Sequence, residues 1–207
     1  SFPTRRSSDL PPYTVERDSS GNITRVVYQG SDEEQSVEVV SGMKMSALLV
    51  GNNLFRMDTR TTPMFYGSTG AAAGTGTNSV RGNILLTVAG APGNYQLSID
   101  GGKSWVSATG SETNIPVIHS ETGEVLYVDT TGITQTGTEP IRVTGTYDLF
   151  NVLIGARDLL NNTEGLPEDQ ILTMLLDTVK DVQEVETKIV RGLPIVGGRI
   201  QTLTNLR

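Results

Sequence analysis

The sequence predicts an α+β fold: an antiparallel β domain with an inserted β module, followed by a helical, hairpin-like arm with a heptad seam. Short alternating apolar runs between turn residues dominate up to about Gly145, and apolar residues then change to helical spacing. A long apolar stripe of heptad type completes the chain. We therefore expect a tail at 1–10, a β-rich outer domain at 11–145 with its insert at about 59–140, and a truncated C-terminal helical arm at 146–207.

The first ten residues are set apart from the fold. They read SFPTRRSSDL and resemble the translation of a sequencing adapter, so they are excluded from fold prediction as an artefactual tail. The alternative is a disordered basic tail. Arg5-Arg6 is not a twin-arginine export signal, because no apolar stretch follows it. Without this segment, which holds two arginines and one aspartate, the net charge of −7 becomes −8.

Composition excludes several functional classes. The chain has no cysteine, which excludes disulfides, thiolate metal sites and a cysteine nucleophile. Its single histidine, His119, lies in a turn-rich segment and is expected at the surface rather than in a zinc site. The acidic balance without a basic stripe argues against nucleic acid, and no apolar run approaches the roughly 18 residues of a membrane span. No nucleophile–base–orienter set is apparent, so we expect no catalytic residue, metal or cofactor.

The first strands are expected to form a hairpin. Tyr13–Arg17 and Ile23–Tyr28 are β-rich runs on either side of the turn cluster Asp18–Asn22. Further strands are predicted at Ser36–Val40 and Met43–Ser46. Together they form the β domain that precedes the insert.

The insert is predicted to begin with a flexible linker. The segment Gly67–Thr77 is small, polar and glycine-rich. Its Gly-x-Gly spacing does not predict a phosphate loop, because another strand follows instead of a helix. The strands expected in the insert are Ile84–Val88, Tyr95–Ile99, Ser104–Val106, Glu124–Val128 and Ile141–Val143.

Two features of the insert have alternative interpretations. Asp100-Gly-Gly102 is expected to be a plain hairpin turn, and the alternative of a calcium loop is less favoured because the pattern occurs once. Trp105 beside Tyr95 is expected to form a core or half-buried aromatic pair. The alternative is a platform on which a sugar stacks.

The arm is predicted to begin with a helix between Tyr147 and Leu160. Asp148 lies near its start, where a carboxylate suits the free N–H groups and the helix dipole. The polar run Asn161–Gly165 ends this helix. A second, long helix starts at Pro167, which suits the first helical position, and acidic residues follow in its first turn.

The heptad stripe is the feature of this long helix that points to assembly. It has a repeating spacing of three and four residues, and all its members but Glu186 are apolar: Leu172, Leu175, Val179, Val182, Glu186, Ile189, Leu193, Val196, Ile200 and Leu203. At about 1.5 Å per residue the stripe is roughly 47 Å long. Nothing else in the sequence is long enough to cover it, which favours an assembly component over a catalyst.

Three further points concern the long helix. Asp181 and Glu184 are expected on a solvated face rather than in a catalytic acid pair. Glu186 either sets the register of the stripe or lies at the edge of a wide groove. Pro194 removes one helical hydrogen bond, so we predict a kink near 190–193 rather than an end of the helix.

Several segments resemble the bacterial flagellin superfamily. Asp148–Leu160, the long helix and Val196–Leu203 are similar to the C-terminal helical part of that family, where a Gly-x-Arg-Leu-x-x-Leu type of sequence occurs at the position of Gly197 to Leu203. Ile23–Gly30 and Gly51–Phe55 resemble the β domain of its hook-associated members. The small β modules inserted in flagellins and hook-associated proteins are similar to 94–101. The resemblance covers about 11–58 and 146–207.

The resemblance implies a non-enzymatic structural subunit of the bacterial flagellum, outside the cell, at the junction of hook and filament. Its arms would form an inner coiled-coil layer, with the β domain facing outward. The implied partners are further copies of the chain and other axial proteins, namely the hook-side junction protein and flagellin, without nucleic acid or membrane.

Three expectations qualify this interpretation. The family has an N-terminal arm and a longer C-terminal arm, so this sequence is expected to be a fragment. Gly192-Leu-Pro194 departs from the family's uninterrupted helix. The alternatives are a filament flagellin, which shares the arms, and a secreted adhesive or carbohydrate-binding β protein with a helical stalk.

Overall fold

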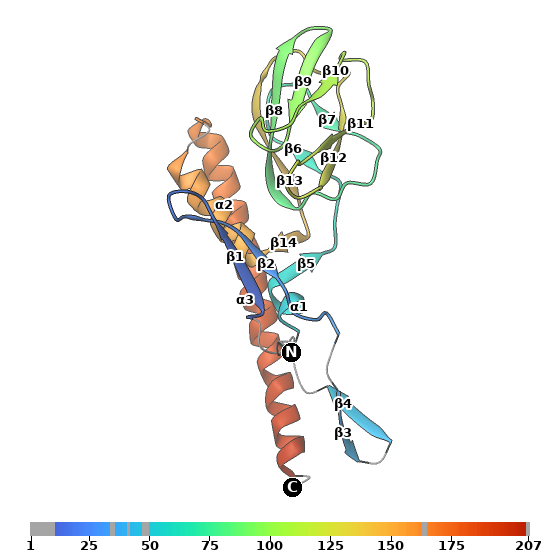
Figure 1. Ribbon diagram of the computed structural model, residues 1–207, viewed down its shortest axis with the longest axis vertical. Coiled ribbons are helices and arrows are strands. Elements are labelled where there is room, and N and C mark those ends of the chain that lie inside the picture. Colours follow the sequence, from blue (N-terminus) through green and yellow to red (C-terminus); the bar gives the residue numbers. More distant parts are fainter. Residues whose placement is uncertain (1–10, 34–35, 41, 47–49, 163–164, 206–207) are drawn as a thin grey trace, which may run out of the picture.

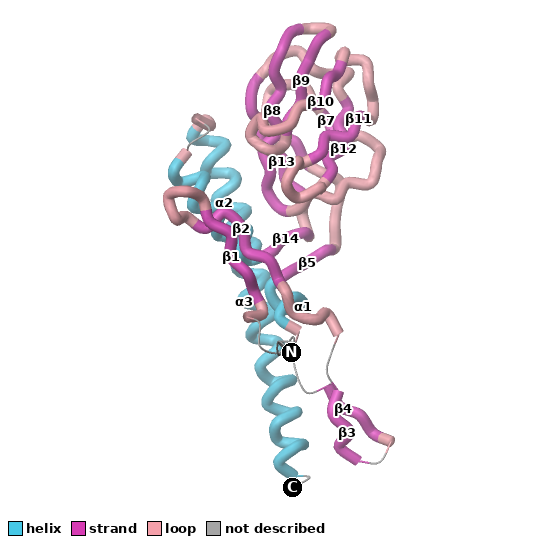
Figure 2. The backbone as a smooth tube through the Cα atoms, viewed as in Figure 1, coloured by secondary structure: helices cyan, strands magenta, loops and turns pink. Residues whose placement is uncertain are grey.

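A computed structural model describes residues 11–33, 36–40, 42–46, 50–162 and 165–205. A β sandwich lies at one end of the molecule, and two helices form an arm that extends past it to the other end (Figure 1). Figure 2 shows the strands of the sandwich gathered away from the long helix, with two small hairpins beside that helix. Antiparallel sheets together with long helices confirm the predicted α+β class. The predicted tail, residues 1–10, lies outside the described residues.

The N-terminal part of the chain forms two hairpins and one short helix. These elements are β1 (Tyr13–Arg17), β2 (Ile23–Tyr28), β3 (Ser36–Val40), β4 (Met43–Ser46) and α1 (Gly51–Phe55). The predicted first hairpin is confirmed. Its turn is held by Asp18, whose Oδ1 accepts hydrogen bonds from the N–H groups of Ser20 and Asn22 at 2.9 and 2.8 Å.

The sandwich is framed by two short strands that pair with each other, β5 (Arg56–Asp58) and β14 (Thr146–Asp148). Between them the chain forms β6 (Met64–Phe65), β7 (Ala72–Ala73), β8 (Gly82–Ala91), β9 (Asn94–Ser98), β10 (Val106–Ala108), β11 (Ile115–Ile118), β12 (Val125–Asp129) and β13 (Gly137–Val143). One sheet has the order β10-β9-β8-β13-β6 and the other has the order β11-β12-β7. All pairs are antiparallel.

The core of the sandwich lies between these two sheets. The most deeply buried apolar side chains come from both of them: Leu86, Val88, Leu97, Val117, Leu126, Val128, Ile141 and Val143. On β9, Tyr95 and Leu97 are buried while Gln96 between them is part-exposed, as expected of a strand with one wet face, but the alternation ends at Ser98, which is buried as well. The core is therefore complete within residues 65–143.

Most of Gly67–Thr77 is a loop, as predicted, but the prediction that this loop is a flexible linker is wrong. Ala72 and Ala73 form β7 and pair with β12, and Thr69 is buried. Gly70 has a φ of +88°, and a Cβ placed on it would collide with the carbonyl of Gly132. Glycine is thus required here for the close approach of two backbones, so this segment is part of the packed sandwich and not a spacer.

The carboxylate of Asp100 holds its turn in place through several hydrogen bonds. Asp100 is buried and accepts hydrogen bonds from the hydroxyls of Ser98, Ser104 and Ser120 at 2.8, 2.6 and 2.7 Å. Burial raises the pKa of this carboxyl, but the hydrogen bonds, those of Ser104 first, outweigh burial and lower the pKa. These contacts make Asp100 a structural turn residue, as the plain-turn interpretation expected.

The predicted aromatic pair differs from the structure. Tyr95 is buried and its hydroxyl donates to the carbonyl of Ile133 at 3.2 Å, whereas Trp105 is exposed. The Trp105 ring lies over Gly102, close to where a Cβ would stand. Because Tyr95 is committed to the core, the two rings do not offer a joint platform for a sugar.

Glu139 gives the sandwich a pH-dependent stability. Its side chain is buried, and its pKa is raised by burial against the lowering effect of hydrogen bonds from Thr69, whose hydroxyl donates to Oε1 at 2.7 Å. A raised pKa means that the folded state holds its proton more tightly than the unfolded state. The stability contribution is therefore full below the ordinary value of 4.5 and is lost as pH rises through the folded-state pKa.

We accordingly expect the variant Glu139→Gln to lose this pH dependence. Relative to the variant, the wild-type chain should become progressively less stable from about pH 4.5 upward until Glu139 is ionised in the folded state. Urea unfolding of both chains between pH 4 and pH 7.5 measures the difference. A constant gap between the two curves, or a gap of the opposite sign, would contradict the assignment.

The arm consists of α2 (Leu149–Asn161) and α3 (Glu168–Asn205), which pack together as an antiparallel hairpin. Asp148 caps α2, as predicted, since its Oδ1 accepts from the N–H groups of Phe150 and Asn151 at 3.0 and 3.3 Å. The predicted helix begins too early, because Tyr147 is not helical. It lies in β14, where it pairs with Met57 of β5.

The long helix continues through Pro194. It is one helix from Glu168 to Asn205, and Figure 1 shows no sharp bend at the predicted kink. Proline has no N–H, so the carbonyl of Val190 lacks its usual helical donor there. The prediction that the helix does not end at this point is confirmed, but the predicted kink is not visible.

An aromatic cluster holds the first hairpin and α1 against α2. The Phe150 ring centroid lies 4.8 Å from that of Tyr13 and 5.8 Å from that of Phe55, and Tyr28 packs on Tyr13 at 5.2 Å. The guanidinium of Arg157 adds a hydrogen bond of 2.7 Å to the carbonyl of Ile23. The arm is thus packed against the β hairpin on one side and the sandwich on the other.

Candidate assembly surface

One side of α3 is packed against its own chain. Its buried residues recur at spacings of three and four: Met174, Asp177, Thr178, Asp181 and Val185. Met174 joins Leu159 and Leu166 in a small core, on which Leu85 of β8 also packs. The residues of this packed side come about one position before the residues of the predicted heptad stripe.

The heptad stripe lies next to the packed side and is largely open. Its most exposed members have exposed fractions between 37% and 64%: Leu172, Val179, Ile189, Leu193 and Ile200. Val182 and Val196 are part-buried, and Leu175 packs on the small core around Met174. Glu186 is exposed. The side chain of Leu203 lies outside the described residues, so its place in the stripe stays a prediction, as does the packing role of the whole set.

Apolar exposure extends beyond the stripe. Leu176, Val190 and Ile195 of α3 are exposed, and so are Leu153 and Leu160 of α2. Figure 1 shows the C-terminal half of α3 running away from both α2 and the sandwich. An apolar surface of this extent is typical of a protein-interaction site rather than of a solvated helix.

A buried ion cluster fixes the sandwich on the arm. The guanidinium of Arg142 on β13 donates to both carboxylate oxygens of Asp181, at 2.7 and 3.2 Å, and its Nε lies 3.5 Å from Asp177. Burial raises the pKa of Asp181, and the hydrogen bonds from Arg142 oppose that effect. Asp181 is therefore buried and paired, which corrects the expectation that it lies on a solvated face.

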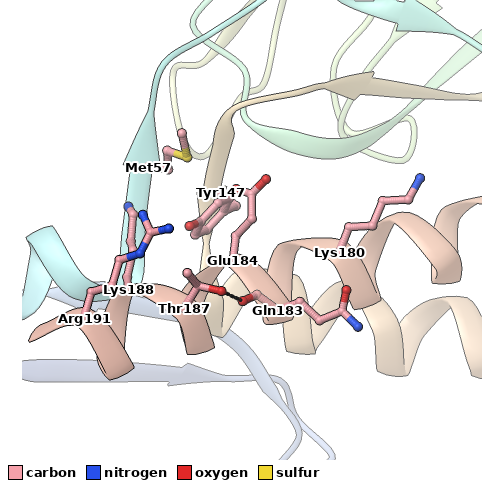
Figure 3. A pocket seen from close by; sticks show the side chains of 8 residues that line it. All are labelled: Met57, Tyr147, Lys180, Gln183, Glu184, Thr187, Lys188 and Arg191. Carbon is pink, nitrogen blue, oxygen red and sulfur yellow. Dashed lines mark hydrogen bonds between the residues drawn. The ribbon is translucent and has the colours of Figure 1, made fainter. Parts of the chain in front are cut away.

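A second feature, the Tyr147 pocket, lies where α3 passes β5 and β14 (Figure 3). It has a volume of about 460 Å³, and its lining includes Met57, Tyr147, Lys180, Glu184, Lys188 and Arg191. Tyr147 is 1% exposed, and its hydroxyl has no hydrogen-bond partner among the described residues. Burial, then the charges of Glu184 and Asp181, raise its pKa to about 12.

Sequence reasoning missed both the ion cluster and the pocket. The sequence gives little signal for the first, since Asp177, Thr178 and Asp181 make the side of the helix between Met174 and Val185 mostly polar. Nothing in the sequence placed Arg142 opposite them, because the pairing depends on how β13 lies against α3.

The described residues contain neither a cluster of metal-binding side chains nor a helix that could span a membrane. No group of three or more His, Cys, Asp or Glu side chains in them is arranged to hold a metal ion. None of the helices in the described part of the chain has the length and apolar character that a membrane crossing needs. His119 is part-exposed, and its Nδ1 accepts from the N–H of Glu121 at 3.3 Å.

Comparison with known proteins finds similar solved structures. No protein-family model and no curated protein sequence matches the chain. FlgL from Xanthomonas campestris is similar, with a TM-score of 0.45, 18% identity and coverage of 94% of this chain. The flagellar junction protein FlgL from Legionella pneumophila has a TM-score of 0.44, 14% identity and coverage of 96%. The chain spans 64% and 66% of the lengths of these two proteins.

Proposed function

We propose that this chain is a structural, non-enzymatic subunit of the bacterial flagellum at the hook–filament junction, and that it assembles through its helical arm. The observation that carries the proposal is the exposed apolar surface of α3, centred on the heptad stripe. The motifs at Asp148–Leu160 and Val196–Leu203, which resemble the flagellin superfamily, support the flagellar assignment. The partners are further copies of the chain and other axial proteins of the flagellum.

The arm has the properties that such a role requires. Full burial of one Leu, Ile or Val side chain contributes about 1.5–3 kcal/mol, so burial of several stripe residues together offsets the cost of association. The C-terminal half of α3 lies away from the sandwich (Figure 1), although Leu175 near the start of the stripe packs on the same small core as Leu85 of β8. A neighbour can therefore pack on the arm while the sandwich stays on the outside of the assembly.

Charge placed in the stripe should prevent self-association. We expect the double variant Leu193→Lys/Ile200→Lys to weaken association of the full chain by about tenfold or more, because two ammonium groups would have to be buried or repelled in the interface. Both positions are exposed in the single chain, so folding should be unaffected. Sedimentation velocity over a concentration series measures the association, and circular dichroism checks the fold.

The matched control is Thr173→Lys/Gln201→Lys. It adds the same charge to the same helix at exposed positions outside the stripe. The proposal predicts that this control associates more strongly than the stripe variant. A wild-type chain that remains monomeric at every concentration, or a stripe variant that associates like the wild type, would refute assembly through this surface.

A further inference from the structure

The Tyr147 pocket holds two cationic side chains without a carboxylate partner. Lys188 and Arg191 both line the pocket, and Figure 3 shows their charged ends directed toward the same region near Met57. Neither forms an ion pair with another described residue. Glu184 also lines the pocket and acts electrostatically on Lys188, but one carboxylate does not balance two cations, so a further anion would be attracted here.

The side chain of Lys188 is part-buried. Its ammonium donates to the carbonyl of Arg56 at 2.9 Å and lies 5.4 Å from the centroid of the Tyr147 ring. Burial lowers its pKa, and Glu184 opposes that effect. A backbone carbonyl and an aromatic face compensate a buried ammonium less well than a carboxylate does.

The remaining pocket residues leave a local excess of positive charge. Lys180 is paired with Asp177 at 3.0 Å, and Glu184 is exposed at the rim. The lining also includes the apolar side chain of Met57 and Tyr147, whose hydroxyl is buried. A carboxylate seated here would meet two cations.

We propose that the Tyr147 pocket receives a carboxylate side chain from a second copy of this chain. This inference rests on the proposed function, since it names a second contact through which the subunits assemble. Charge complementarity favours this occupant: the chain has 23 acidic and 16 basic residues, so a second copy offers more carboxylates than cations to a positively charged pocket.

The position of the pocket agrees with a head-to-tail contact. Arg191 and Leu193 are two residues apart, which at 3.6 residues per turn places them about 160° apart around the helix. A neighbour packed on the stripe therefore leaves the pocket open for another neighbour. Two different surfaces that each contact another copy give a heterologous interface, which builds helical arrays or rings rather than closed pairs.

The test removes the two charges and measures association. We expect Lys188→Gln/Arg191→Gln to weaken self-association of the full chain by roughly tenfold at low salt, with a smaller difference at 0.5 M salt, where exposed charges are screened. The control Arg25→Gln/Lys103→Gln removes the same charge from exposed surface pairs elsewhere and should associate within about twofold of the wild type.

A second measurement uses free glutarate as the probe. At equal ionic strength, sodium glutarate should raise the thermal unfolding midpoint of the wild type more than that of Lys188→Gln/Arg191→Gln, because it binds the folded state. If the stripe variant loses association but the pocket variant keeps it, the proposed function stands and this inference is overturned. Stabilisation by glutarate without any effect on association also overturns it, in favour of a small-molecule site.

Discussion

Replacing Arg142 with methionine is expected to lower the free energy of unfolding by about 3–5 kcal/mol. The change leaves the buried carboxylates of Asp177 and Asp181 without the guanidinium that pairs with both. Breaking a buried ion pair by removing one partner costs far more than a surface pair contributes, because the remaining charge stays desolvated. The sandwich should also lose its fixed orientation on α3.

Urea unfolding followed by circular dichroism measures this loss. The control is the triple variant Arg142→Met/Asp177→Asn/Asp181→Asn, which removes the stranded charges together with the guanidinium and should recover most of the stability. If Arg142→Met alone unfolds within about 0.5 kcal/mol of the wild type, the cluster does not connect the two parts of the molecule in the way that the distances indicate.

Truncating Leu126 to alanine should destabilise the sandwich by about 2–5 kcal/mol. Leu126 is fully buried in the core between the two sheets, so its removal loses apolar burial and leaves a cavity that the surrounding strands fill only in part. The fluorescence of Trp105, the single tryptophan, reports unfolding of this part of the chain.

The control for this variant lies on the neighbouring strand. Ile118 of β11 is 48% exposed, so Ile118→Ala removes a comparable volume without opening a cavity in the core. Its cost should stay well below that of Leu126→Ala. Equal losses for the two variants would mean that the core between the sheets does not dominate the stability of the sandwich.

Much of the fold was predictable because its signals are local. The first hairpin followed from β-rich runs around a turn, and the start of α2 followed from a carboxylate before a helical pattern. The long helix also followed from the spacing of its apolar residues, and it continues past Pro194. In each case the residues that decide the element are close together in the sequence.

The remaining features depend on residues that are far apart. Gly70 is required by its approach to Gly132, and Arg142 meets Asp181 across 39 positions. Glycine-rich composition is shared by flexible spacers and tightly packed backbones, so it did not distinguish them here. The stripe showed that α3 is amphipathic, but which side faces its own chain depends on tertiary packing that the spacing does not specify.

The pairing of β5 with β14 has a consequence for how such a molecule can diversify. The N–H of Thr59 donates to the carbonyl of Gly145 at 2.8 Å, so the chain enters and leaves the sandwich through adjacent, hydrogen-bonded points. A sandwich attached in this way can be replaced. A module of another size, or a tight loop, can join the same two points without moving the helical arm. Insertions or deletions in the sandwich can thus leave the packing of α2 on α3 unchanged.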